Sequence, residues 1–143
     1  MKKAVFAFAS ALGLAAPALA EDVPTLVTIL SSDEPQTQLM SMVLTMQSIQ
    51  QGSNAHVLLC GPAGDLALKE APASATAPQE PRGVSPQGLM QNIMESGAKV
   101  EVCALYLPNK GVGADALLDG VTAAKPNEMA ARMLAPNTRI MSQ

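Results

Sequence analysis

Short apolar runs alternate along the chain with longer segments that have the periodicity of helices. The run from Thr25 to Leu30 is rich in β-branched residues and mostly apolar, which is typical of a strand buried on both faces. Four later runs are bounded by Gly, Pro, Asn or Ser in the same way. The pattern predicts five strands, at residues 25–30, 55–60, 99–104, 121–125 and 138–141.

Helical periodicity lies between these strands. It predicts helices over residues 36–51, 86–96 and 114–119 and a last one that begins near Asn127. The first helix is uncharged, and its apolar residues cover more than half of its circumference, which is wider than the stripe of an ordinary surface helix. We expect its outer side to be covered either by the loop between residues 65 and 86 or by a neighbouring subunit.

Strands that alternate with helices predict a parallel sheet with right-handed crossovers. The expected fold is therefore a three-layer α/β domain with a five-stranded, mainly parallel sheet. We expect the strand order 2-1-3-4-5. Strand 2 then lies on one side of strand 1 and strand 3 on the other, so the topology of the sheet reverses between strands 1 and 3. The segment Glu70–Pro86 is rich in Pro and Ala, so we expect a long flexible loop there.

The first 20 residues have the layout of a secretory signal peptide. Lys2 and Lys3 precede an apolar stretch, and Ala18-Leu-Ala20 is a small-residue cleavage signal. We therefore expect an exported, periplasmic protein whose single domain spans residues 21–143. The apolar stretch is short for a membrane span, so no membrane attachment is expected after cleavage.

Charge and aromatic content exclude several classes of function. The mature chain would carry a net charge of about −5, which disfavours nucleic acid and anionic membranes as partners. It would contain no Phe or Trp and only one Tyr, Tyr106, so the stacking surfaces that bind bases or flat cofactors are nearly absent. We expect no cofactor.

The candidate chemistry is at Cys103, near the carboxyl end of the third predicted strand. An oxidising compartment makes a disulfide the default for the pair Cys60 and Cys103. In the expected strand order they are two strand spacings apart, about 9.6 Å, so a disulfide fits poorly unless the strand ends or loops converge. The only histidine, His56, lies early in its strand and is expected to be structural. A Cys-x-x-Cys motif and a Cys–His pair are both missing, so Cys103 would act alone.

Ligands of open α/β sheets bind where the topology reverses, at the carboxyl ends of the strands. Residues near that point would therefore line a crevice next to Cys103. After strand 1 these are Ser31, Ser32 and Asp33. In the turn after strand 3 they are Lys110 and Gly111.

The chain resembles the DsrE/DsrF-like family from about Leu26 onwards. The matching pieces are Leu89-Met-Gln-Asn-Ile-Met-Glu-Ser-Gly97, then Val100-Glu-Val-Cys103, Gly111 and Leu117-Leu-Asp-Gly-Val121. The resemblance implies a flavodoxin-like fold and assembly into trimers or hexamers. It also implies that Cys103 carries sulfur as a persulfide between donor and acceptor proteins, as in the family's sulfur-relay members.

Two other functions stay open from the residues alone. A non-catalytic oligomer that binds a partner would need Cys103 only as a buried residue. A Cu(I)-binding protein could use Met40, Met42 and Met46, which are close in the first helix, because thioether sulfur favours Cu(I). Methionines at helical spacing are more often core residues, so no metal site is expected. The sequence does not decide whether the protein is an enzyme.

Overall fold

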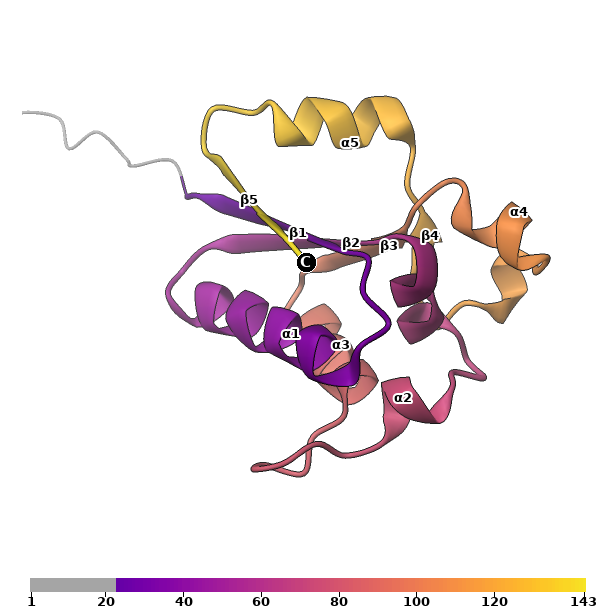
Figure 1. Ribbon diagram of the computed structural model, residues 1–143. Helices are drawn as coiled ribbons and strands as arrows, with labels where there is room; N and C mark the ends of the chain where they lie inside the picture. The colour runs from indigo at the N-terminus through magenta and orange to yellow at the C-terminus, as the bar shows by residue number, and fades with distance from the viewer. Residues whose placement is uncertain (1–22) are drawn as a thin grey trace, which may run out of the picture.

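The computed structural model describes residues 23–143, and the expected signal peptide lies outside these residues. The chain folds as an α/β domain around one five-stranded sheet (Figure 1). The strands are β1 (Thr25–Leu30), β2 (Asn54–Leu59), β3 (Lys99–Val102), β4 (Thr122–Ala123) and β5 (Thr138–Ser142), and all four pairings are parallel. The predicted three-layer α/β fold with its parallel sheet is confirmed.

Helices cover both faces of the sheet. Figure 1 shows α1 (Pro35–Gln50) and α3 (Pro86–Glu95) on one face and α5 (Pro126–Met133) on the other. The shorter helical segments are η1 (Gly61–Ala67, a 3₁₀ helix), α2 (Ala73–Thr76), α4 (Tyr106–Lys110) and η2 (Ala114–Ala116). Helices α1, α3 and α5 each have Pro in the first turn, where its fixed φ favours the start of a helix.

The strand order is β4-β3-β2-β1-β5, so the predicted order 2-1-3-4-5 is wrong. The difference follows burial: β2, an edge strand in the expected order, is buried at its last four positions and lies inside the sheet between β1 and β3. The two residues of β4 are exposed and form one edge of the sheet. The five residues of β5 are mostly exposed, and that strand lies on the edge, beside β1. The topology of the sheet therefore reverses between β1 and β5: β2, β3 and β4 lie on one side of β1, and β5 lies on the other.

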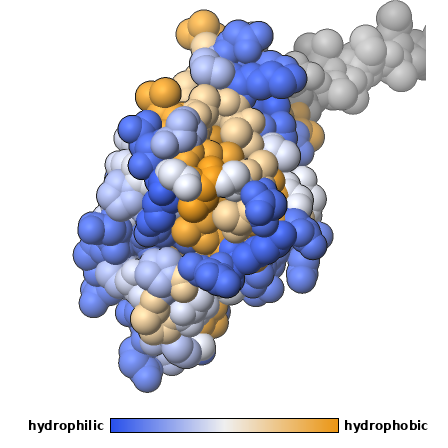
Figure 2. All heavy atoms as spheres, turned by 90° about the vertical axis from the view of Figure 1, so that its right-hand side faces the viewer, coloured by the Kyte–Doolittle hydropathy of each residue, from blue (hydrophilic) through white to orange (hydrophobic). Residues whose placement is uncertain are grey.

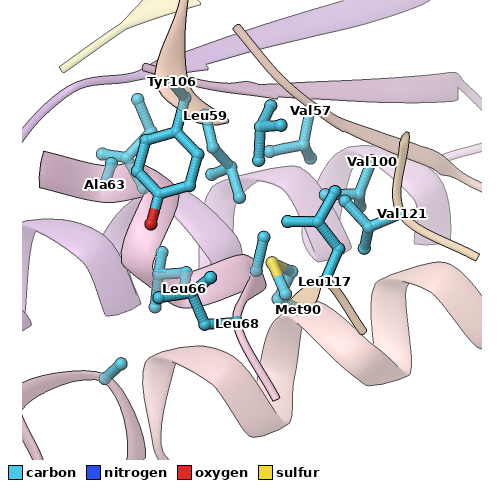
Figure 3. Close-up of a cluster of buried hydrophobic side chains, with 14 of the residues drawn as sticks. Val57, Leu59, Ala63, Leu66, Leu68, Met90, Val100, Tyr106, Leu117 and Val121 are labelled. Atoms are coloured by element: carbon cyan, nitrogen blue, oxygen red, sulfur yellow. The ribbon is translucent and has the colours of Figure 1, made fainter. Parts of the chain in front are cut away.

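The main hydrophobic core lies between the sheet and the layer of α1 and α3, and it extends to η1 and to Tyr106 (Figure 3). A smaller apolar cluster lies under α5, formed by Val27, Leu58, Ala124 and Met129. His56 and Glu101 are almost fully buried, and they alternate along their strands with residues of the main core, so their side chains lie on the face of α5.

The side of helix α1 that is buried is mostly polar, rather than apolar as in an ordinary amphipathic helix. Its buried residues are Gln38, Ser41, Met42 and Thr45, and the Thr45 hydroxyl forms a 2.7 Å hydrogen bond with that of Thr28. Met40 and Leu44 are exposed. A groove of about 760 Å³ lies between this outer side and the segment 79–84, so the loop after η1 covers α1 only in part.

The Pro/Ala-rich segment has local structure, although it was predicted as a loop throughout. It contains the single turn α2, and Gln79 and Val84 form an antiparallel bridge across a tight turn. None of the helices between residues 23 and 143 is long and apolar enough to cross a membrane.

Candidate functional site

The two cysteines are bonded to each other, although the expected strand order made this pairing a poor fit. Cys60 directly follows β2, Cys103 directly follows β3, and their Cα atoms are 5.0 Å apart. This is one strand spacing rather than two, because β2 and β3 are neighbours. The register pairs Leu59 with Val102, which makes the cysteines the next pair beyond the strands.

The disulfide lies at the carboxyl edge of the sheet and is half-buried on both sides. Both residues pack against the small apolar cluster under α5. Leu105, two residues after Cys103, is 72% exposed. Figure 2 views this end of the molecule and shows apolar side chains gathered in the middle of the face, with hydrophilic residues around them. The cysteines thus lie at an edge of the sheet where both residues are partly exposed.

The predicted crevice between strands 1 and 3 is occupied by β2. Ser31, Ser32 and Asp33 follow β1, which lies between β2 and β5, so they are next to Cys60 and to the end of β5 but are separated from Cys103 by β2. The Ser31 hydroxyl donates to the backbone carbonyl of Gln143 at 2.9 Å, and the Ser32 hydroxyl accepts from the backbone N–H of Glu34 at 3.1 Å. Both hydroxyls therefore have structural partners.

Lys110 and Gly111 end helix α4, which follows Cys103. Gly111 has a φ of 75°, and its N–H donates to the carbonyl of Leu107 at 2.9 Å. This left-handed conformation closes the helix and favours glycine. The Lys110 ammonium donates to both carboxylate oxygens of Asp65, at 2.7 and 2.9 Å. Lys110 is therefore engaged by the segment that follows Cys60.

Sequence reasoning missed the partners of that lysine. Asp65 also accepts a 2.6 Å hydrogen bond from the hydroxyl of Tyr106, which is buried. Burial, followed by the hydrogen bond and the charge of Asp65, raises the pKa of Tyr106 well above its ordinary value. Tyr106 is the only tyrosine of the chain, and its place shortly after Cys103 does not identify a partner. Its contact with Asp65 had no signal in the sequence, because the two residues are 41 positions apart.

His56 is buried beside a carboxylate, away from the sulfur atoms. Its Nε2 atom lies 2.8 Å from Oε2 of Glu101, and Lys99 lies 2.6 Å from the other oxygen of that carboxylate. Burial lowers the pKa of His56, with a further contribution from the positive charge of Arg132. The pKa of Glu101 is also lowered: its burial acts in the opposite direction, but the hydrogen bond from Lys99 and the charge of His56 outweigh it.

The methionines proposed for Cu(I) do not converge. Met42 is fully buried in the main core, whereas Met40 is 54% exposed on the outer side of α1. Among residues 23–143, no group of three His, Cys, Asp or Glu side chains could hold a metal ion.

Solved structures with the same fold include three whose sequence identity to this chain is low. YchN from E. coli matches with a TM-score of 0.67 and 16% identity, over 85% of this chain and 100% of its own. MTH1491 from Methanobacterium thermoautotrophicum, a protein of unknown function, has a TM-score of 0.59 and 14% identity over 85% and 100%.

BT1422 from Bacteroides thetaiotaomicron, also of unknown function, has a TM-score of 0.63 and 18% identity, over 84% of this chain and 95% of its own. No family model and no curated protein matches the sequence. This chain has a DsrE/YchN-like fold.

Proposed function

We propose that the protein is an exported member of the DsrE/DsrF-like family and a sulfur carrier that holds sulfane sulfur as a persulfide on Cys103. The observation that carries this proposal is the place of Cys103, half-buried at the carboxyl edge of the sheet and directly after β3. The shared fold and the motif around Cys103 both support it. The two proteins of unknown function among the structural neighbours contribute the fold alone.

The chemistry requires a thiolate at Cys103. In the reduced protein, this thiolate attacks the outer sulfur of a polysulfide or another sulfane donor, and the donor leaves as a shorter thiolate. A sulfur–sulfur bond forms on Cys103 while one breaks in the donor, so no separate oxidant is needed. An acceptor thiolate then attacks the outer sulfur and takes it away.

The disulfide supports the proposed periplasmic location. Disulfides form and persist in oxidising compartments and are rare in the bacterial cytosol. The negative net charge and the shortage of aromatic residues agree with protein or small inorganic partners rather than nucleic acid.

Intact-mass analysis tests the carrier function. The Cys60→Ser variant is used, because in the wild type Cys60 can re-form the disulfide and expel the sulfur as hydrosulfide. The variant is reduced, freed of reductant and exposed to polysulfide, and a gain of one sulfur atom, about 32 Da, is expected. Cys103→Ser should gain none. No adduct on Cys60→Ser, or an equal adduct on Cys103→Ser, would refute the proposal.

A non-catalytic oligomer is the second candidate, favoured by the outer side of α1. Met40 and Leu44 are exposed there, Met40 at the groove, while polar side chains of the same helix face the sheet. We propose that a second copy of the chain covers this side in a trimer or hexamer. Light scattering should show a multiple of the chain mass for the wild type and a monomer for Leu44→Glu. A monomeric wild type would contradict the assembly.

A further inference from the structure

The segments that follow the two cysteines are joined by side chains that contain no sulfur. Helix η1 follows Cys60 and contains Asp65, and α4 follows Cys103. Asp65 accepts hydrogen bonds from the Tyr106 hydroxyl at 2.6 Å and from Lys110 at 2.7 and 2.9 Å. These three residues form what we call the Asp65 clamp.

Tyr106 also fills space that the backbone of η1 leaves free. Figure 3 shows its ring among the buried side chains of η1 and β2, near Ala63 and Leu66. A Cβ atom at Gly64 would overlap this ring, so the close approach requires glycine at that position. The clamp is thus a packed contact as well as a set of hydrogen bonds.

Helix η1 is itself held to the rest of the core. The side-chain amide of Gln87 in α3 donates to the carbonyls of Leu66 and Leu68, both at 2.9 Å. The backbone N–H of Leu118 donates to the carbonyl of Ala67 at 2.8 Å. Besides the disulfide, η1 is therefore held by α3 and Leu118, and α4 is held by the Asp65 clamp.

From this arrangement we propose that Cys60 is the second working sulfur of the site, and that the disulfide accepts hydrosulfide (inorganic sulfide) as its substrate. This inference rests on the proposed carrier function. Hydrosulfide attacks Sγ of Cys103, the bond to Cys60 breaks, and Cys60 leaves as a thiolate. The products are a persulfide on Cys103 and a thiolate on Cys60. The sulfide sulfur is oxidised to sulfane sulfur, and the disulfide is the oxidant.

The reverse step defines the role of the clamp. The Cys60 thiolate attacks Sγ of Cys103, the disulfide re-forms, and hydrosulfide leaves. Asp65 and Tyr106 act as positioning residues here, because they set how often the two sulfurs meet. Passing the sulfane sulfur to an acceptor instead leaves two thiols, and an external disulfide must then restore the pair by thiol–disulfide exchange.

The test starts from oxidised wild-type protein and sodium sulfide, followed by a thiol-alkylating reagent and mass analysis. We expect two alkyl groups and one extra sulfur, about 32 Da, with the extra sulfur mapped to the peptide of Cys103. Two alkyl groups without extra sulfur would mean simple reduction and would overturn the inference. So would an unreacted disulfide, or an extra sulfur on Cys60.

The Cys60→Ser variant distinguishes a failure of this inference from a failure of the carrier function on which it rests. It should take sulfur from polysulfide but none from hydrosulfide, because it has no disulfide to supply the oxidising equivalents. If it takes sulfur from neither reagent, the carrier function fails. If it takes sulfur from polysulfide while the oxidised wild type ignores hydrosulfide, only the present inference fails.

The positioning role is read from the effective concentration of the two thiols, measured by equilibration with a glutathione buffer. Tyr106→Phe should lower it by about tenfold, the equivalent of one hydrogen bond to a charged group. Lys125→Met is the matched control, because it removes an exposed ion pair with Glu128 on α5 and should leave the value unchanged. An unchanged value in Tyr106→Phe, with the melting temperature recorded alongside, would overturn the positioning role.

Discussion

The hydroxyl of Tyr106 donates to Oδ1 of Asp65 at 2.6 Å, and this bond ties together the segments that follow Cys103 and Cys60. Strands β2 and β3 already place the two cysteines one strand apart. The Tyr106–Asp65 bond joins the chain beyond the sheet as well, between η1 and α4, the segments that follow the two cysteines.

The single tyrosine makes this bond visible by titration. Tyr106 is the only Tyr in the chain, so phenolate absorbance reports on it alone. Its pKa is raised in the folded protein, so the absorbance should appear at a higher pH than in the unfolded chain. Asp65→Asn should move the transition toward the ordinary value. Identical titration curves for the folded and unfolded wild type would contradict the contact.

Because the pKa of Tyr106 is raised, the same bond predicts a loss of stability in alkali. The unfolded chain begins to lose the tyrosine proton near pH 10, while the folded protein keeps it. The free energy of unfolding should therefore fall as the pH rises above that value. Tyr106→Phe should lack this part of the pH dependence in a series of urea titrations.

Gly64→Ala should destabilise the protein, because the added methyl group overlaps the ring of Tyr106. Overpacking of this kind costs about 1–3 kcal/mol. Gly113→Ala is the matched control: its methyl group would meet only the side chain of Asp115, which is exposed and can move. Urea denaturation measures both variants, and equal stabilities would show that the Tyr106 contact is not tight.

Reduction of the disulfide should lower stability without unfolding the domain. Cys60 and Cys103 are 43 positions apart, and the loop-entropy model assigns about 4 kcal/mol to a closed loop of that length. The midpoint of urea denaturation should fall when a reductant is added, and the Cys60→Ser variant should not respond. A reduced protein with no native circular dichroism would contradict the independent role given to the Asp65 clamp.

Acid should lower the stability of the protein through the buried pair of His56 and Glu101 under α5. The pKa of His56 is lowered, chiefly by burial, so the unfolded chain takes up a proton on this residue more readily than the folded protein does. Stability should therefore decline as the pH falls below about 6.5, the unfolded value. Glu101 adds to the decline at lower pH, because its pKa is lowered too. His56→Gln should flatten the first part of the curve, and an unchanged curve would exclude His56 as its source.

Much of the fold could be predicted from local patterns. Apolar runs and glycine stops placed β1 and α1 to within about one residue, and their alternation gave the parallel sheet. The order of strands could not be obtained this way, because it depends on which buried strand packs beside which. The choice between β1 and β2 as the neighbour of β3 rests on side-chain packing across the sheet.

That one error in strand order changed the candidate site. It separated Cys103 from Cys60 and placed it beside Ser31–Asp33, whereas the structure does the reverse. The Asp65 clamp could not be predicted either, because the sequence around Asp65 or Tyr106 does not indicate a partner 41 positions away. The role of Cys103 as the sulfur-bearing residue stays a prediction.

Cyanolysis tests that central claim most directly. Protein loaded with polysulfide and freed of excess reagent is treated with cyanide, which removes sulfane sulfur as thiocyanate. The account predicts about one thiocyanate per chain, one for each persulfide, from Cys60→Ser, in which no disulfide can re-form and expel the sulfur as hydrosulfide, and none from Cys103→Ser. No thiocyanate from Cys60→Ser, or as much from Cys103→Ser, would contradict it.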